Sequence, residues 1–146
     1  MGWLGIAVAL AWGGLGCASK PKGASSKSLG AVVVYAVTPI QIQQATADVF
    51  QGELYTTLKS SPTQLVFEKP GSWMNQVAYS GWFGADVWAR VKVNIRSYDT
   101  HSHLVECEVF MVRGHGDAFF EEEVRVLGLK RRPFQELMDK VKRRLN

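Results

Sequence analysis

Three histidines and two turn aspartates are the side chains of this 146-residue chain that suggest metal or proton chemistry. His101 and His103 are two residues apart, so both would lie on one face of a strand. Asp99, His115 and Asp117 lie in stretches that read as turns, and these turns would approach the same end of the sheet. Zinc sites use histidine and carboxylate ligands, so a metal-dependent hydrolase would need the three histidines to converge. That function is the second alternative for this chain.

Other patterns of catalysis or ligand binding are missing from the sequence. The chain contains no His-Glu-x-x-His or paired-cysteine spacing, and no Gly-x-Ser-x-Gly nucleophile elbow. Gly114-His115-Gly116 lacks the strand, the Lys-Ser/Thr pair and the helix of a phosphate-binding loop. We therefore expect a protein that is not an enzyme and that holds no cofactor and no metal ion. No recognition motif for nucleic acid is present either, so nucleic acid is not an expected partner.

The two cysteines have different surroundings. Cys107 lies within a strand-like run, which predicts a small buried hydrophobic side chain rather than a reactive thiol. Cys17 ends an uncharged run, residues 2–16, in which every residue is apolar or glycine. This run has the length of a signal-peptide core and is shorter than the roughly 20 residues that a membrane-spanning helix needs.

The sequence Gly14-Leu15-Gly16-Cys17 resembles the lipobox of bacterial lipoprotein signal peptides, in which a small residue precedes the cysteine. The resemblance implies that residues 1–17 are a signal peptide and that Cys17 becomes the lipidated N-terminus. Ala18 after the cysteine implies the periplasmic face of the outer membrane. Gly14 stands where leucine is usual, and no Lys or Arg precedes the run. An ordinary secretory peptide and an uncleaved anchor remain the alternatives.

Residues 18–30 are rich in Ser, Gly, Ala and Lys, which predicts a flexible linker. Its lysines would favour an anionic lipid surface, or would simply keep the linker soluble. Residues 31–146 are enough for one domain with a single core and too few for two.

Within this domain, the apolar run 32–37 predicts a buried strand. Thr38, Pro39 and Gln41 have the spacing of a capping box that begins a helix. The apolar stripe of this helix continues through Leu54 and Leu58, so we expect it to end at 60–62. A short strand is expected over 64–68.

The stretch 69–86 is rich in aromatic residues and glycines, with a further strand expected near 76–79. Trp73, Trp82 and Phe83 either fold onto the core or present a binding surface.

Two runs of alternating residues, 87–96 and 105–112, predict an antiparallel hairpin. Glu106 and Glu108 should face basic residues of the first run. A last strand is expected in which Phe120, Val124 and Val126 share one face and Glu121, Glu123 and Arg125 share the other.

A C-terminal helix begins near Pro133 and carries one apolar face. Residues 130–146 hold seven Lys and Arg against two acidic residues. Such a basic helix would bind an acidic partner or an anionic lipid surface, or would be a solvated face. The residues predicted to contribute to a binding surface here are Lys140, Lys142, Arg143 and Arg144.

The element order strand, helix, several antiparallel strands and helix predicts an α+β domain of two layers, with about four to six strands and both helices on one face. It resembles the helix-grip domains of small envelope lipoproteins, including the accessory lipoprotein of the outer-membrane β-barrel assembly machine. The resemblance implies a membrane-anchored, non-catalytic accessory or assembly factor that binds another envelope protein. The first alternative is a binder of an apolar small molecule or lipid, which requires a cavity of several hundred Å³ between sheet and C-terminal helix.

Overall fold

The computed structural model describes residues 19–71, 87–126, 128 and 130–146. Two helices and six strands follow one another along these residues. They are β1 (Gly30–Tyr35), α1 (Pro39–Gly52), β2 (Thr56–Ser60), β3 (Gln64–Pro70), β4 (Trp88–Asp99), β5 (Ser102–Arg113), β6 (Glu122–Arg125) and α3 (Arg132–Leu145). The predicted strand near 76–79 lies outside the described residues. No helix in the described part of the chain has the length and apolar character needed to cross a bilayer.

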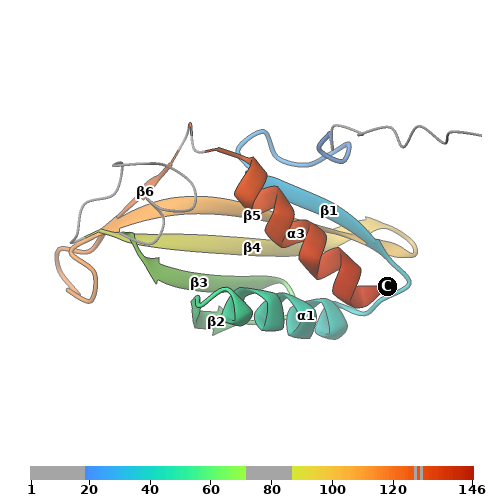
Figure 1. Cartoon of the computed structure of the whole chain (residues 1–146), viewed down its shortest axis with the longest axis horizontal. Coiled ribbons are helices and arrows are strands. Elements are labelled where there is room, and N and C mark those ends of the chain that lie inside the picture. The colour runs from blue at the N-terminus through green and yellow to red at the C-terminus, as the bar shows by residue number, and fades with distance from the viewer. Residues whose placement is uncertain (1–18, 72–86, 127, 129) are drawn as a thin grey trace, which may run out of the picture.

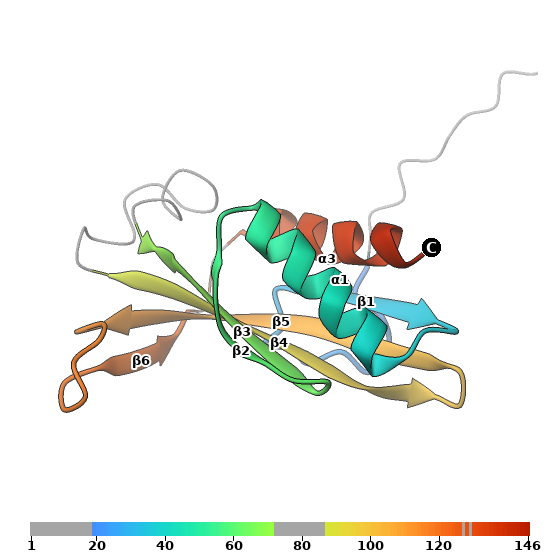
Figure 2. The same cartoon turned by 90° about the horizontal axis from the view of Figure 1, so that it is seen from below.

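The six strands form one antiparallel sheet in the order β1-β5-β4-β3-β2, and β6 also pairs with β5. β1 pairs with the first half of β5 and β6 pairs with its last residues, so both lie along the same side of β5. Both helices lie over one face of this sheet (Figures 1 and 2). The predicted α+β architecture is confirmed.

α1 begins where the sequence predicts and ends earlier. Thr38 Oγ1 accepts from the Gln41 amide at 3.2 Å, and Gln41 Oε1 accepts from the Thr38 amide at 2.8 Å, which completes the capping box. The prediction that the helix runs through Leu58 is wrong, because the chain leaves the helix after Gly52 and Leu54 has a φ of 67°. Leu54 and Leu58 are consequently exposed. The β-branched pair after Tyr55 instead begins β2, which pairs with β3.

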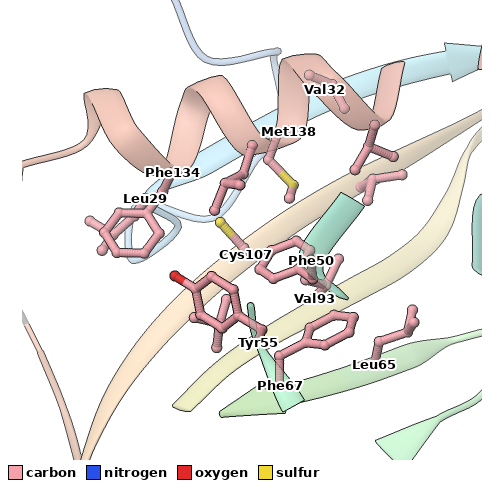
Figure 3. Packing of buried hydrophobic residues seen from close by; sticks show 14 of the residues in the cluster. Leu29, Val32, Phe50, Tyr55, Leu65, Phe67, Val93, Cys107, Phe134 and Met138 are labelled. Atoms are coloured by element: carbon pink, nitrogen blue, oxygen red, sulfur yellow. The ribbon is translucent and has the colours of Figure 1, made fainter. Parts of the chain in front are cut away.

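The main core lies between the sheet and the two helices, as Figure 3 shows. Phe50 of α1 stacks on Phe67 of β3 with ring centroids 4.3 Å apart. Phe134 and Met138 of α3 are also fully buried. α3 approaches β1 closely, because a Cβ on Gly30 would lie 2.6 Å from the Phe134 carbonyl oxygen. Gly30 therefore sets the distance between this helix and the sheet edge.

The N-terminal segment, residues 19–30, packs on the domain over part of its length. Ser28 and Leu29 are buried, and the Leu29 amide donates to the Cys107 carbonyl at 2.9 Å, which extends the pairing of β1. The Ser25 amide donates to Glu106 Oε2 at 2.8 Å. The predicted linker 18–30 is therefore wrong for residues 25–30, because Leu29 completes the core and Gly30 begins β1.

The hairpin of β4 and β5 is confirmed, with Val93 opposite Cys107. As predicted, Glu106 forms an ion pair with Arg96, N to O distance 3.2 Å. Glu108 pairs instead with Arg125 of β6 at 3.0 Å. The prediction for Phe120 is wrong, since it precedes β6 and is exposed.

Candidate functional site

A connected group of charged side chains lies on the sheet face that carries no helix. Arg90 of β4 is at its centre. Its Nη2 atom donates to Glu68 Oε1 at 2.5 Å and to Glu121 Oε1 at 2.8 Å, and its Nη1 atom donates to Glu123 Oε2 at 2.8 Å. Lys92 forms a further ion pair with Glu123. One arginine thus joins carboxylates of β3, β6 and the loop before β6.

These contacts determine the protonation of the group. Burial alone would lower the pKa of Arg90, but its hydrogen bonds to Glu123 and Glu121 raise it above the ordinary value. Burial alone would raise the pKa of Glu123, but hydrogen bonds from Lys92 and Arg90 hold it below its ordinary value. Hydrogen bonds from Arg90 and from the Gly116 amide lower the pKa of Glu121. At neutral pH the arginine and both carboxylates are charged.

His115 fixes the loop between β5 and β6, residues 114–121, to the charged group. Its ring stacks on Trp88 with centroids 4.0 Å apart and planes at 9°. Its Nε2 atom lies 2.5 Å from Oε2 of Glu68, whose side chain is almost completely buried. A carboxylate that orients an imidazole is part of hydrolytic sites, but among the described residues no serine, threonine or cysteine hydrogen-bonds to His115. The contact accounts for the position of the loop.

Hydrogen bonds also fix the conformation of this loop. Asp117 Oδ1 accepts from the amides of Phe119 and Phe120 at 2.9 and 3.2 Å. The Asp117 amide donates to the Gly114 carbonyl at 3.0 Å, and the Glu121 amide donates to the Asp117 carbonyl at 3.0 Å. Gly114 has a φ of 62°, and a Cβ there would lie 2.7 Å from the Phe120 carbonyl oxygen. The turn requires glycine at this position.

The loop presents two aromatic rings to solvent. Phe119 is 91% exposed and Phe120 is 78% exposed, and we call this pair the aromatic tip. Large apolar side chains held at such exposure are typical of interaction sites. The aromatic tip was not predicted from the sequence, because the alternation of apolar and polar residues in the last strand extends back to Phe120. This pattern places Phe120 in that strand. The available signal was Asp117 in a glycine-containing turn, where an aspartate caps the following amides.

The predicted binding residues at the C-terminus are partly engaged by α1. Lys140 forms an ion pair with Glu53, and Arg144 Nη2 lies 2.7 Å from Asp48 Oδ2. These pairs hold α3 against α1 and reduce the free positive charge. Lys142 lines a hollow beside the N-terminal segment, and Arg143 is exposed. Cys17 and the predicted aromatic residues Trp73, Trp82 and Phe83 lie outside the described residues.

The three histidines do not converge as the metal-dependent hydrolase requires. His101 lies in the turn between β4 and β5, and His103 lies at the start of β5. His115 follows the other end of β5, which is 12 residues long and so extends over about 40 Å. No cluster of three or more metal-ligating side chains occurs in residues 19–71, 87–126, 128 and 130–146.

The space between the sheet and α3 is largely filled by side chains. Phe50, Phe67, Phe134 and Met138 are at most 1% exposed. A pocket of about 100 Å³ opens beside α3, and an open hollow of about 340 Å³ lies where α3 meets β1. Charged residues share the lining of both, so among the described residues neither is the enclosed apolar cavity that the apolar-ligand alternative needs.

Cys107 lies in the same packed region. It is completely buried, and burial raises the pKa of its thiol to about 12. The prediction of a small buried hydrophobic residue is confirmed.

Comparison with protein-family models, curated proteins and solved structures found no match to this chain.

Proposed function

We propose that this chain is a lipid-anchored envelope protein that acts as a non-catalytic accessory or assembly factor by binding another envelope protein. The lipobox-like sequence that ends at Cys17 supports attachment to the membrane, and Ala18 supports the periplasmic face of the outer membrane. The packed core and the aromatic tip support a role in protein binding rather than in enclosing a ligand.

The observation that carries the proposal is the exposure of Phe119 and Phe120 on a loop of fixed conformation. A partner that covers both rings removes apolar surface from water, and aromatic side chains are frequent hot spots of interfaces. The loop is already held by Asp117 and His115, so binding would cost little conformational entropy. A rigid apolar projection of this kind fits a pocket on a folded partner.

The chemistry around the tip favours a protein over a lipid bilayer as its partner. Asp117, Glu121 and Glu122 lie in or next to the loop, and they would be repelled by an anionic membrane surface. The same charges would suit a partner whose apolar pocket has a basic rim.

Attachment to the membrane is tested by the mass of the protein isolated from its native membrane, compared with a Cys17→Ala form. We expect a mass increase of the size of a diacylglyceryl group that is lost in the variant. An unmodified and soluble mature chain would contradict lipid anchoring and favour a secreted or periplasmic binding protein.

Partner binding is tested by replacing Phe119 with a photoreactive phenylalanine in the full chain and irradiating native envelopes. We expect one cross-linked species of defined mass. To test the two rings themselves, the photoreactive residue is moved to Ala118, which is exposed. In this background the double substitution Phe119→Ser/Phe120→Ser should remove the cross-linked species. The matched control is Ile40→Ser, because Ile40 is 68% exposed on α1 and lies outside the tip. Failure to obtain a specific cross-link, or its survival in the double variant, would contradict the proposal.

A further inference from the structure

We infer that the surface around the N-terminal segment lies against an anionic phospholipid membrane and so sets the orientation of the domain. This inference rests on the proposed membrane attachment. Cys17 is three residues before Lys20, so the two Cα atoms are at most about 11 Å apart. A chain anchored at Cys17 must therefore hold the surface that carries Lys20 close to the lipid.

The segment after the anchor is attached to the domain rather than separated from it by a long tether. Arg96 Nη2 donates to the Gly23 carbonyl at 2.5 Å, and the Ser25 amide donates to Glu106, so these two bonds hold the segment on the sheet. Lys20 Nζ donates to the Ser25 carbonyl at 3.1 Å, which folds the start of the segment back on itself. The distance between membrane and domain is accordingly short.

Cations from three parts of the sequence come together here. Lys22 and Lys27 are exposed on the N-terminal segment, and Arg131 is exposed immediately before α3. The last residue of the segment lies against the start of α3, where a Cβ on Gly30 would be 2.6 Å from the Phe134 carbonyl oxygen. Burial and then the positive charge of Arg131 lower the pKa of Lys20. We call this group, completed by Lys142, the N-terminal basic patch.

Lys142 is assigned to the patch because it lines a hollow of about 340 Å³ together with Ser19 of the N-terminal segment. Tyr35 and Tyr98 line the same hollow and are 58% and 40% exposed. Tyrosines are enriched where proteins meet the headgroup region of a bilayer, because the ring is apolar and the hydroxyl is polar. Asp139 is the acidic residue of this hollow.

Two acidic groups lie next to the patch. Glu106 pairs with Arg96, and Asp139 accepts a hydrogen bond from the neutral amide of Gln135 at 3.0 Å and so keeps its negative charge. Because the patch holds several lysines and an arginine, it keeps an excess of positive charge around exposed tyrosines. That combination matches the anionic headgroups of phospholipids.

This orientation leaves the aromatic tip available to a partner. Glu106 contacts the N-terminal segment, whereas the tip follows Arg113 at the end of β5. The seven residue-to-residue steps from Glu106 to Arg113 extend over about 24 Å along the strand. The domain can therefore contact the membrane and a protein partner at the same time.

The test is the rate at which an amine-reactive reagent acylates each lysine of the full chain reconstituted into vesicles. Vesicles of phosphatidylcholine alone are compared with vesicles of phosphatidylcholine mixed with phosphatidylglycerol. In the anionic vesicles we expect acylation of Lys22 and Lys27 to slow by about fivefold, and the protection to disappear at high salt.

Lys59 is the internal control, because it is exposed on β2 at the opposite edge of the sheet. Its rate should be equal in both vesicles. Acylation of Lys142 should also slow in the anionic vesicles, because Lys142 belongs to the same patch. The variant Lys22→Glu/Lys27→Glu changes exposed residues only and should abolish this protection of Lys142. Equal rates at Lys22 in the two vesicles, or equal protection of Lys59, would overturn the inference. Flotation of the chain with each kind of vesicle is measured separately, so failed membrane attachment is distinguished from equal rates on attached protein. Neither readout depends on whether the tip binds a partner.

Discussion

The two faces of the sheet bury apolar side chains by different means. On the face covered by α1 and α3, alternate residues of β3, β4 and β5 contact helix side chains and form the main core. Phe67, Val91 and Val109 lie in register across these three strands and are almost completely buried. Stabilisation on this face comes from the hydrophobic effect and close packing, which need no particular charge or hydrogen bond.

The other face has no helix, yet Phe110 and Val112 are buried there as well. Lys92 Nζ lies 4.3 Å from the centroid of the Phe110 ring, and the guanidinium of Arg125 lies 5.1 Å from it. The long side chains thus cover the ring while their charges pair with glutamates. This face depends on directional contacts, and both the aromatic tip and residues 23–25 of the N-terminal segment are attached to it.

The largest effect is expected in the main core. Phe67→Ala removes a ring that is fully buried against Phe50, and it should lower the free energy of unfolding by about 3–5 kcal/mol. Urea unfolding followed by circular dichroism measures this loss. Ile40→Ala is the control and should change stability by less than about 0.5 kcal/mol, since Ile40 is exposed. If Phe67→Ala lowered the free energy of unfolding by less than Ile40→Ala does, the helix-covered face would not be the main source of stability.

A somewhat smaller loss is expected on the helix-free face. Arg90→Met leaves the buried carboxylate of Glu68 without its arginine partner, which should cost about 3 kcal/mol. Adding Glu68→Gln should recover part of the loss, because the unpaired charge is then removed. The same urea experiment on Arg90→Met, Glu68→Gln and the double variant checks this. If the double variant were less stable than the wild-type chain by the full sum of the two single losses, the two side chains would be independent and the comparison would fail.

The smallest effect is a dependence on pH confined to the helix-free face. The pKa values of Glu121 and Glu123 in the folded protein lie below their ordinary value of 4.5. Their contribution to stability is therefore present above pH 4.5 and is lost as the pH falls through the folded values. Hydrogen exchange at decreasing pH should show protection lost in β6 before α1. Glu123→Gln should make the protection of β6 less sensitive to acid. If protection were instead lost first in α1, the acid-sensitive carboxylates would not be those of the helix-free face.

Much of the fold follows from local sequence patterns. The capping box at Thr38, the alternating residues of β4 and the apolar face of α3 each specify an element through contacts between near neighbours in the chain. The end of α1 was predicted wrongly because the apolar stripe continues past Gly52. The left-handed conformation of Leu54 and the pairing of β2 with β3 depend on distant residues.

The candidate surfaces were less predictable than the fold. Residues 25–30 read as a linker from composition, but the sheet offers them Cys107 and Glu106 as hydrogen-bond partners. The basic end of α3 read as free, but Asp48 and Glu53 of the α1 region neutralise part of it. In each case a contact with a residue far away in the sequence determined whether the segment is free or packed, and local composition does not reveal such a contact.

The sequence by itself determined the α+β class, the hairpin and the burial of Cys107, because periodicity and polarity act over a few residues. Only the tertiary structure decided that His115 meets Glu68 and that Arg90 joins Glu121 and Glu123. His115 and Glu68 are 47 residues apart and become neighbours through the register of β3, β4 and β5 and the turn that follows. Register and turn geometry are cooperative properties of the whole sheet, and they place Phe119 and Phe120 in solvent.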